Sequence, residues 1–163
     1  MTHYTRTDSP LGELLLVGEG DTLVSLSLPG QRTAPAVRPD WVRDDEAFTE
    51  VVRQLSVYFA GRLTRFELHL APRGTRFQER VWRVLDEIPY GTTTTYGELA
   101  ARLEVPRAEI RAVGAAIGAN PLLIVRPCHR VIGADGSMRG YAGGVERKVR
   151  LLTHEGALQQ MLV

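Results

Sequence analysis

The chain has a single cysteine among its 163 residues, so no disulfide can form within it. Its N-terminus lacks an apolar signal core, and no run of about 20 apolar residues is present. Cys-x-x-Cys and His-x-x-x-His pairs are also lacking, because the histidines are scattered along the sequence. We therefore expect a cytoplasmic protein with no membrane segment, no bound metal and a reduced thiol.

A strong excess of charge of either sign is absent as well. The net charge is +1 and apolar residues make up 44% of the chain, which is typical of a globular protein. The charge is uneven, because residues 1–72 carry 7 basic and 10 acidic side chains whereas residues 73–163 carry 13 and 9. The second half is the better candidate for contact with a polyanion, and a solvated charged face is the alternative.

The first 72 residues have strand patterns followed by one helical pattern. Strands are expected at 4–7, 13–18 and 22–28, joined by turns into an antiparallel meander. Apolar residues recur at helical spacing from Phe48 to Phe59, and a short strand is expected at 66–70. The composition of residues 71–74 is that of a linker. We predict a small α/β domain over 1–72 and a second domain over 73–163.

From Thr75 onward the pattern is mainly helical. An apolar stripe from Phe77 to Ile88 predicts one helix, and Thr95 and Glu98 have the spacing of a capping box at the start of another. After a short break at 104–106, a further helix is expected over 107–118. Two short helices joined by so tight a turn indicate a helix-turn-helix.

The second helix of this pair has a nearly bare face opposite its buried stripe of Ile110, Val113 and Ile117. That face carries arginines among small residues: Arg107, Arg111, Gly114, Ala115 and Gly118. A glycine costs a helix about 1 kcal/mol relative to alanine, so close approach to another backbone is expected here. The partner is either DNA, with Arg111 as a probe in the groove, or another part of the protein, with Arg111 solvated.

The only cysteine lies in the segment 127–131, beside a histidine. The apolar run 122–125 predicts a buried strand that ends just before Cys128. A lone cysteine is usually inert, but a histidine next to it at the end of a strand indicates a nucleophile and its base. Fully extended, the two side chains would point to opposite faces, so His129 is expected to reach the thiol through a bridging water or a bend.

A carboxylate is predicted to point inward near the C-terminal end. The loop 139–144 is rich in glycine and can close over a planar ligand or act as a connector. The helix after it has an apolar stripe of Val145, Val149 and Leu152. Glu155 continues that stripe, where it loses water and opposes the helix dipole, so it needs a partner. His129 is one candidate, and Arg130 or Arg147 is the alternative.

Several short segments occur in one order and spacing: Tyr96 to Ala100, Arg111 to Gly114, Gly118 to Pro121, Pro127 to Val131, Gly140 to Gly144 and His154 to Gly156. Together they strongly resemble the O6-alkylguanine-DNA alkyltransferases. The first 72 residues are similar, less distinctively, to the N-terminal domain of that family. The resemblance implies an α/β (α+β) fold, with a ribonuclease H-like domain followed by a mainly helical, winged helix-turn-helix-like domain.

The resemblance also implies an activity. Such a protein repairs double-stranded DNA by direct, irreversible transfer of an alkyl group, usually methyl, from O6 of guanine or O4 of thymine to a cysteine. The protein is consumed in the reaction and needs no cofactor or methyl donor. Its expected partner is double-stranded DNA carrying O6-alkylguanine, and a monomer is expected.

By position, the resemblance implies that Cys128 is the acceptor, that His129 deprotonates it through water and that Glu155 orients His129. Tyr96 would donate a hydrogen bond to the leaving base. Asn120 would tie the recognition helix to the active-site strand near the thiol. The residues that would form the base pocket are Ile117, Leu123, Val131, Tyr141 and Ala142.

The same resemblance implies a DNA-binding face. Its residues are Tyr96, Arg111, Ala112, Gly114 and Ala115. The helix would lie in the minor groove, with Arg111 filling the gap left by the rotated nucleotide. The sequence departs from the family at position 126, where Arg126 replaces an apolar residue. The arginine either lowers the pKa of the thiol or points to solvent. Glu109 and Ile110 replace small residues before the arginine.

Two other functions use part of the same residues. A thiol hydrolase or acyltransferase could use Cys128, His129 and Glu155, but the helix that carries Arg111 would then have no purpose. A lesion sensor or transcription regulator would use the helix-turn-helix and ignore the thiol. Relatives of that second kind replace the acceptor cysteine, and this chain keeps it.

Overall fold

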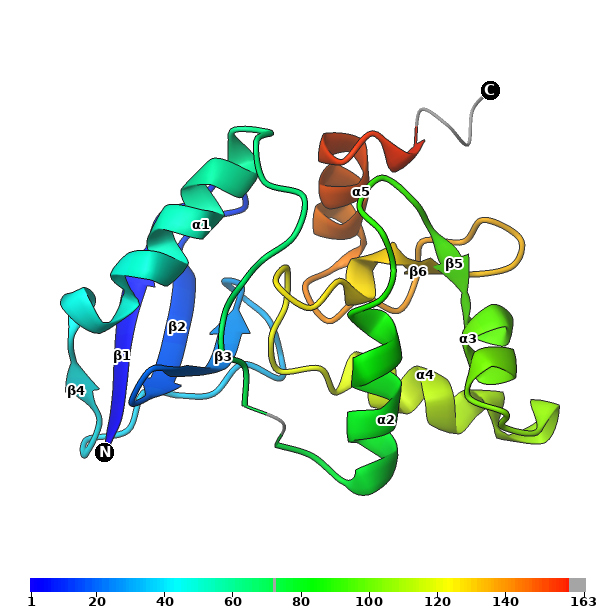
Figure 1. Ribbon diagram of the computed structural model, residues 1–163, viewed down its shortest axis with the longest axis horizontal. Coiled ribbons are helices and arrows are strands. Elements are labelled where there is room, and N and C mark those ends of the chain that lie inside the picture. The colour runs from blue at the N-terminus through cyan, green and yellow to red at the C-terminus, as the bar shows by residue number, and fades with distance from the viewer. Residues whose placement is uncertain (72, 159–163) are drawn as a thin grey trace. The chain divides into compact units, whose positions relative to one another are not determined.

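The computed structural model describes residues 1–71 and 73–158. They divide into two compact units (Figure 1): Met1–Pro72 with Pro121–Val125, and Arg73–Asn120 with Arg126–Val163. The sequence predicted one boundary between residues 72 and 73. The structure adds the short segment 121–125 to the first unit, although this segment comes much later in the chain.

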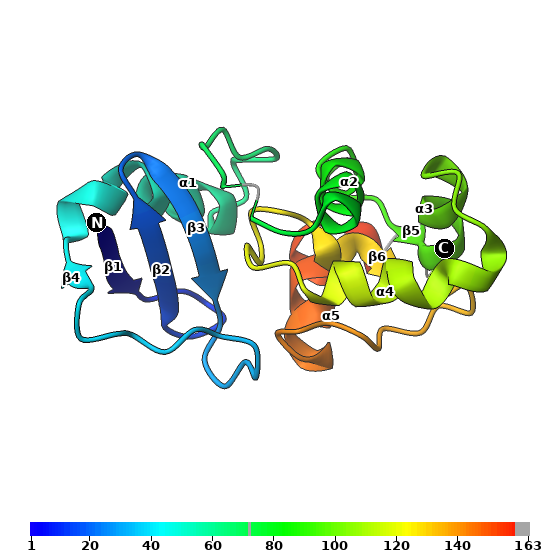
Figure 2. The same ribbon diagram turned by 90° about the horizontal axis from the view of Figure 1, so that it is seen from below.

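The first unit contains a four-stranded sheet with a helix beside it (Figures 1 and 2). The predicted antiparallel meander is confirmed as β1 (Thr2–Thr7), β2 (Leu14–Glu19) and β3 (Thr22–Ser27). A short strand β4 (Val42–Arg43) pairs with β1 in parallel, which gives the order β3-β2-β1-β4. Two residues carry no periodicity, so β4 could not be predicted from the pattern.

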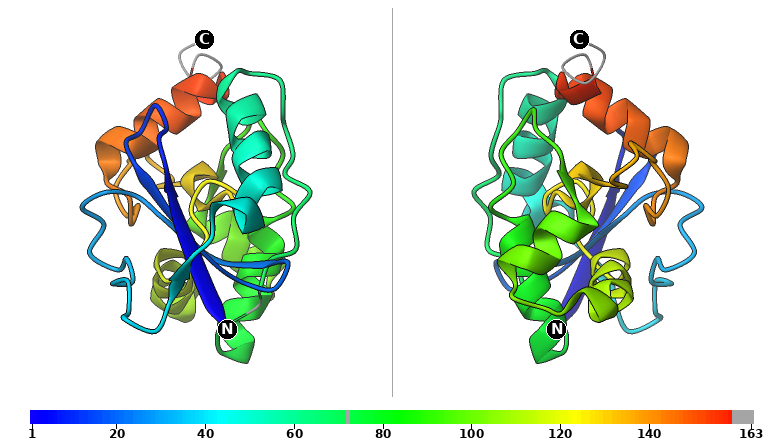
Figure 3. Two further views of the ribbon diagram at one scale, coloured as in Figure 1. Left: turned by 90° about the vertical axis from the view of Figure 1, so that its left-hand side faces the viewer. Right: turned by 90° about the vertical axis from the view of Figure 1, so that its right-hand side faces the viewer.

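The predicted helix of the first unit is α1 (Thr49–Phe59), which follows the 3-10 turn η1 (Asp45–Phe48). The left view of Figure 3 shows α1 alongside the strands. Asp44 caps η1 by accepting a hydrogen bond from the Ala47 amide. Gly18 of β2 lets the Phe48 ring pack onto the strand, since an added Cβ would lie 3.1 Å from that ring.

The predicted strand at 66–70 is wrong. Only Leu70 forms an isolated bridge, with Leu23. The Gln54 side chain of α1 takes the place of a neighbouring strand, because its carboxamide donates to the Glu67 carbonyl at 3.0 Å and accepts from the Glu67 amide at 2.9 Å. A side chain thus satisfies the backbone groups that a strand would have paired.

The predicted strand at 122–125 is also wrong, although the segment is buried as expected. Leu122 forms one parallel bridge with Leu26, and the Val125 amide donates to the Leu123 carbonyl at 2.8 Å, which is a turn. Ile124 has a φ of 70°, a left-handed conformation that a β-branched residue adopts only where the surroundings impose it. An apolar run alone does not distinguish a buried turn from a strand.

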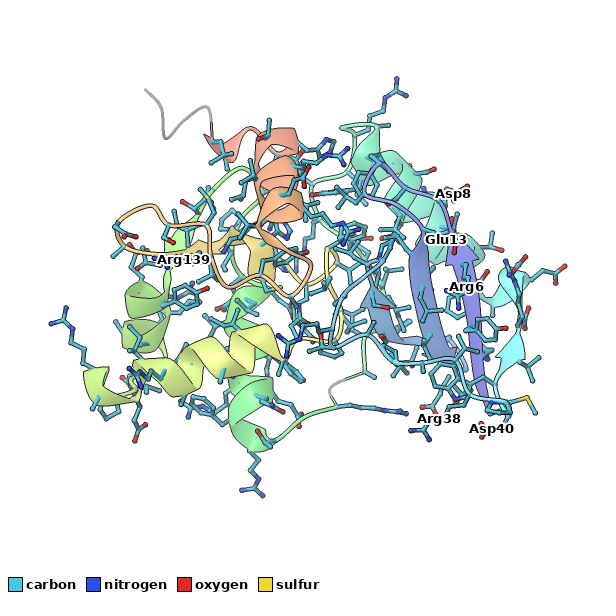
Figure 4. The ribbon with its side chains drawn as sticks, turned by 180° about the vertical axis from the view of Figure 1, so that it is seen from behind. Arg6, Asp8, Glu13, Arg38, Asp40 and Arg139 are labelled. Carbon is cyan, nitrogen blue, oxygen red and sulfur yellow. The ribbon has the colours of Figure 1, made fainter. Side chains whose placement is uncertain are left out.

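Exposed charged side chains surround the sheet of the first unit. Figure 4 shows Asp8 and Glu13 at one end of β1, and Arg38 and Asp40 at the other end. All four are exposed. The acidic balance of the first 72 residues therefore includes a solvated face.

The second unit is mainly helical, as predicted. Its elements are α2 (Arg76–Leu85), β5 (Thr94–Thr95), α3 (Tyr96–Arg102), the 3-10 turn η2 (Arg107–Glu109), α4 (Ile110–Gly118), the 3-10 turn η3 (Cys128–Arg130), β6 (Val131–Ile132) and α5 (Val145–His154). β5 and β6 pair in parallel. The right view of Figure 3 faces the end of this unit that carries α3 and α4.

Capping residues and one indole set the helix arrangement of the second unit. Thr75 and Gln78 form a complete capping box at the start of α2. At the start of α3, Thr95 accepts from the Glu98 amide at 3.1 Å, but the Glu98 carboxylate accepts from Thr94 instead of completing the predicted box. Trp82 joins α2 to α4, since its indole N–H donates to the Ala116 carbonyl at 2.8 Å.

Within residues 1–71 and 73–158, no helix has the length and apolar character needed to cross a membrane.

Candidate active site and DNA-binding face

Cys128 begins the turn η3, which continues through His129 and Arg130. The Cys128 amide donates to the Arg126 carbonyl at 2.8 Å and the Arg130 amide to the Pro127 carbonyl at 3.0 Å. The chain therefore bends here instead of extending, which is one of the two arrangements expected from the sequence. Cys128 is 5% exposed and His129 is fully buried.

Asn120, which follows α4, contacts the cysteine directly. Its Nδ2 donates to Cys128 Sγ at 3.2 Å and to the Arg126 carbonyl at 3.3 Å. Asn120 is itself buried. One carboxamide thus joins the end of α4 to the turn that carries the thiol, and its N–H can stabilise negative charge on the sulfur.

Glu155, at the C-terminal end of α5, binds both His129 and Arg130. Its Oε2 is 2.8 Å from His129 Nε2, and Arg130 donates to the same carboxylate from Nε at 2.8 Å and from Nη2 at 3.1 Å. The sequence left His129 and an arginine as alternative partners. The structure shows that Glu155 takes both, and all three side chains are buried.

These contacts fix the proton on His129. Burial raises the pKa of Glu155, but the hydrogen bonds from His129 and Arg130 outweigh burial and hold this pKa well below its usual range. Burial lowers the pKa of His129, so the ring is neutral at pH 7. Because the carboxylate only accepts, Nε2 carries the proton and Nδ1 has the lone pair. Nδ1 is buried and has no hydrogen-bond partner among the described residues, so it is the available basic nitrogen.

The thiol of Cys128 needs such a base. Burial raises its pKa to about 11, although Asn120, Lys148 and Arg126 each act in the opposite direction. The sulfur is therefore protonated at pH 7, and the thiolate forms only when a neighbouring group accepts the proton.

Loss of stability below pH 6.5 is expected from the buried neutral His129. The unfolded chain takes up a proton near pH 6.5, whereas the folded protein, with its lowered pKa, does not. Stability is therefore lost as the pH falls from 6.5 toward the folded pKa, by up to about 1.4 kcal/mol per pH unit. Urea unfolding at pH 7.5, 6.5 and 5.5 should give a flatter dependence for His129→Gln than for the wild type.

The matched control is His69→Gln, which replaces an exposed histidine of the first unit. It should keep the wild-type pH dependence. Equal pH dependence in the wild type and His129→Gln would show that His129 does not fold as a neutral, buried ring.

Two buried cations lie near the thiol: Lys148, which the sequence did not indicate, and Arg126. Lys148 is the only lysine of the chain and is 1% exposed, and its Nζ donates to the Val131 carbonyl. Burial lowers the pKa of Lys148 to about 8. The sequence left two alternatives for Arg126. It is 5% exposed, so it does not point to solvent, and its positive charge acts to lower the pKa of the Cys128 thiol. Among the twenty lysine and arginine residues only one is a lysine, and this rarity could have drawn attention to Lys148.

Lys148 also corrects the predicted stripe of α5. Val145 was expected to be buried but is 46% exposed, and Val149 is only half-buried. The buried positions are Lys148, Leu151, Leu152 and Glu155. The helical period was right, but the face is rotated because two charged residues have partners inside the unit.

Two tyrosines have neutral hydroxyls near the sulfur. Tyr96 is half-buried and donates a long hydrogen bond of 3.5 Å to the carbonyl of Arg139, which lies in the loop before α5 (Figure 4). Tyr141 is buried, its ring meets His129 edge to face at 6.4 Å, and no described residue forms a hydrogen bond with its hydroxyl. Burial raises the pKa of both phenols, and a charge on Cys128 raises it further. Both remain donors at pH 7.

The other predicted pocket residues divide between the two units. Ile117 on α4 and Val131 on β6 are buried in the second unit, and Ala142 in the loop before α5 is half-buried. Leu123 is buried in the segment 121–125, which belongs to the first unit.

The bare face of α4 lies open. Arg111, Ala112 and Ala115 are exposed. Among the residues that the structure describes, a Cβ added at Gly118 would meet nothing within 4 Å, and one added at Gly114 would only touch the Tyr96 ring at 3.8 Å. Tight packing inside the protein is therefore not the reason for these glycines. Of the two explanations that the sequence allowed, contacts among the described residues do not support packing inside the protein.

In the part of the chain that the structure describes, no group of three or more histidine, cysteine, aspartate or glutamate side chains could hold a metal ion.

Two family models match this chain. The one described as "6-O-methylguanine DNA methyltransferase, ribonuclease-like domain" matches residues 2–72. The one described as "6-O-methylguanine DNA methyltransferase, DNA binding domain" matches residues 76–157. Between them they cover almost all of the described chain.

Named relatives agree with these matches. The methylated-DNA–protein-cysteine methyltransferase of Mycobacterium bovis is 50% identical over 95% of this chain and 93% of its own length. That of Methanosarcina acetivorans is 46% identical over 95% and 99%. Among solved structures, Mycobacterium tuberculosis OGT in complex with DNA has a TM-score of 0.88 and 48% identity, covering 95% of this chain and 93% of that one.

Proposed function

The chain belongs to the 6-O-methylguanine DNA methyltransferase family, and we propose that Cys128 is the residue that takes the alkyl group from O6 of guanine in duplex DNA. The protein repairs DNA by alkyl transfer to a cysteine. The observation that carries the assignment is the only cysteine of the chain, held by Asn120 and followed directly by the His129–Glu155 pair. The protein is itself the acceptor, and we propose that each monomer reacts once.

The proposed reaction is a displacement at the alkyl carbon. His129 Nδ1 takes the thiol proton through a bridging water, and Glu155 steadies the resulting imidazolium through Nε2. The thiolate forms the S–C bond as the C–O6 bond breaks, and the electron pair of that bond goes to the base. Tyr96 donates a hydrogen bond, and then a proton, to the leaving guanine. Every electron pair is supplied by the thiol and the substrate, so no cofactor is needed.

The proposed base pocket lies around Tyr141. A buried hydroxyl and a buried imidazole nitrogen without partners are rare in folded proteins, and a bound ligand or water normally satisfies them. Val131 and Ile117 supply apolar walls, and Ala142 belongs to the glycine-rich loop over the site. An alkylated guanine offers hydrogen-bonding atoms and a flat ring, and we propose that O4-alkylthymine can also enter.

The exposed face of α4 is the proposed DNA contact, with Arg111 filling the place of the nucleotide that rotates out of the stack. Tyr96, Ala112, Gly114 and Ala115 would border the groove. Small residues allow the helix backbone to approach the DNA closely.

Arg111→Ala should therefore slow repair of alkylated duplex by about tenfold or more, because the arginine offsets an unstacking cost of a few kcal/mol. Transfer from free O6-benzylguanine, which needs no extrusion, should change little. Single-turnover rates on both substrates measure the difference. Arg62→Ala, an exposed arginine of the first unit, is the matched control. Equal losses on the two substrates would count against extrusion by Arg111.

The assignment as a whole is tested by stoichiometry. Duplex carrying radiolabelled O6-methylguanine, given in excess, should transfer one methyl group per protein molecule and then stop. Continued turnover would contradict the proposal and favour the thiol hydrolase.

A size measurement on the free protein should give a monomer.

A further inference from the structure

Arg126 lies beside the proposed acceptor with its guanidinium held on three sides. The guanidinium carbon is 5.2 Å from the centre of the Trp82 ring. Its Nε forms an ion pair with Asp86 Oδ1 at 3.5 Å, without a hydrogen bond, and its Nη1 donates a long hydrogen bond of 3.4 Å to Asn120 Oδ1. The side chain is only 6% exposed. A buried cation needs such partners, because each one offsets part of the lost hydration.

The position of this guanidinium is set by a rigid element. Trp82 and Asp86 are four residues apart at the end of α2, so they share one face of that helix. The Trp82 indole is fixed in turn by its hydrogen bond to the Ala116 carbonyl of α4. An aromatic ring below and a carboxylate beside it leave the guanidinium edge directed at Asn120.

The guanidinium contact favours one orientation of the Asn120 carboxamide, together with the Arg126 carbonyl that accepts from Nδ2. Arginine can only donate, so the group that faces Nη1 must be the carboxamide oxygen. With Oδ1 facing Arg126, Nδ2 faces Cys128 Sγ and the Arg126 carbonyl. A carboxamide turned by 180° would bring its oxygen toward the sulfur, where it would repel a thiolate instead of stabilising it.

We infer that Arg126 is a positioning residue of the transfer reaction: it fixes the carboxamide of Asn120 so that Nδ2 donates to the sulfur of Cys128 as that sulfur becomes charged. The inference rests on the proposed role of Cys128 as acceptor. It assigns a task to Arg126, which stands where the family resemblance implies an apolar residue. The Asn120–sulfur hydrogen bond then depends on a chain of contacts that begins at Trp82 and Asp86.

Other groups also act on the sulfur, so the test must separate them from Arg126. Lys148, His129, Tyr96 and Tyr141 surround it, and Glu155 and Arg130 act on it through His129. The guanidinium of Arg126 is itself a nearby positive charge. A direct effect of that charge and an effect through Asn120 make opposite predictions for Asp86, because removing a carboxylate increases the positive field but releases the guanidinium.

The first experiment therefore compares transfer rates from O6-benzylguanine to the wild type, Arg126→Met and Asp86→Asn at pH 7. Arg126→Met should be slower by about tenfold, the equivalent of one pKa unit. Asp86→Asn should also be slower, by a smaller factor. The Asp86 side chain is partly exposed, so we expect this variant to fold. A rate for Asp86→Asn equal to or above that of the wild type would overturn the positioning role. Arg83→Met, an exposed arginine on α2, is the matched control.

The second experiment tests the route through Asn120. In an Asn120→Ala background, Arg126→Met should slow transfer by less than about twofold, since the group it positions is gone. A full tenfold loss in that background would show that Arg126 acts on the sulfur directly or only through stability.

A third measurement does not depend on alkyl transfer at all. The chain has one asparagine and one cysteine, so labelling these two residue types gives one side-chain amide and one Cβ signal by NMR. The wild type should show a nuclear Overhauser effect between the Asn120 amide protons and the Cys128 Cβ protons, and Arg126→Met should lose it. The Cys128 Cβ signal should also titrate at higher pH in Arg126→Met. An unchanged amide contact and titration would overturn the inference, whether or not Cys128 proves to be the acceptor.

Discussion

Replacement of Cys128 with serine is expected to abolish alkyl transfer while alkylated duplex still binds. The substitution changes one atom, and the serine oxygen can accept the same hydrogen bond from Asn120 that the sulfur accepts. A hydroxyl is a much weaker nucleophile than a thiol toward carbon, and His129 cannot ionise it to a useful extent at pH 7. Transfer is measured by the loss of methyl label from duplex, and binding by the mobility shift of the same duplex.

A cysteine elsewhere on the protein provides the matched control for Cys128→Ser. Ser56 is an exposed residue of α1, so Ser56→Cys in the Cys128→Ser background restores a thiol without the Asn120 and His129 contacts. This double variant should remain inactive. Methyl transfer at the wild-type rate by either variant would contradict the role of Cys128, and loss of binding would mean that the serine protein is not a fair test.

Replacement of Glu155 with glutamine is expected to destabilise the fold by about 3–5 kcal/mol, the usual cost of removing one partner of a buried ion pair. The Arg130 guanidinium would then stay buried without its counter-charge. Its other contacts among the described residues include the Ile88 carbonyl at 2.6 Å and the Tyr90 ring at 5.7 Å. Urea unfolding at pH 7 measures the change.

The same variant should transfer alkyl groups at least about a hundredfold more slowly, the smaller end of the range for general base catalysis. The neutral amide holds the His129 proton on Nε2 less firmly and does not stabilise an imidazolium. Rates are compared at a temperature at which circular dichroism shows the variant to be folded. Glu146→Gln, an exposed carboxylate in the first turn of α5, should cost at most about 1 kcal/mol of stability and leave transfer unchanged. Similar values for the two variants would contradict the assigned role of Glu155.

Much of the site was predictable because its residues obey local rules. The cysteine beside a histidine, the carboxylate on an apolar helical stripe and the small-residue face of α4 are patterns that the sequence displays directly. The inward carboxylate implied that Glu155 needs a partner, and the structure shows that His129 and Arg130 are its partners. The meander of β1 to β3 and the helices α1 to α5 follow from periodicity and capping residues in the same way.

The parts that the sequence missed depend on contacts between distant residues. The run 122–125 is as apolar as a strand, yet one bridge to Leu26 and a turn at Ile124 define it. Arg126 is buried against Trp82 and Asp86, which share a helical face forty or more positions earlier. Lys148 lies on the buried face of α5, where Val145 and Val149 were expected, because the carbonyl of Val131 accepts a hydrogen bond from its ammonium group. The residue pattern of one segment cannot predict partners that lie in a distant segment.

The most direct measurement is the intact mass of the protein after it is mixed with an oligonucleotide duplex containing O6-methylguanine, followed by peptide mapping. The predicted result is a gain of one methylene per molecule, located on Cys128, with an equal amount of guanine restored in the DNA. An unchanged protein mass with demethylated DNA, or a methyl group on any other residue, would contradict the account.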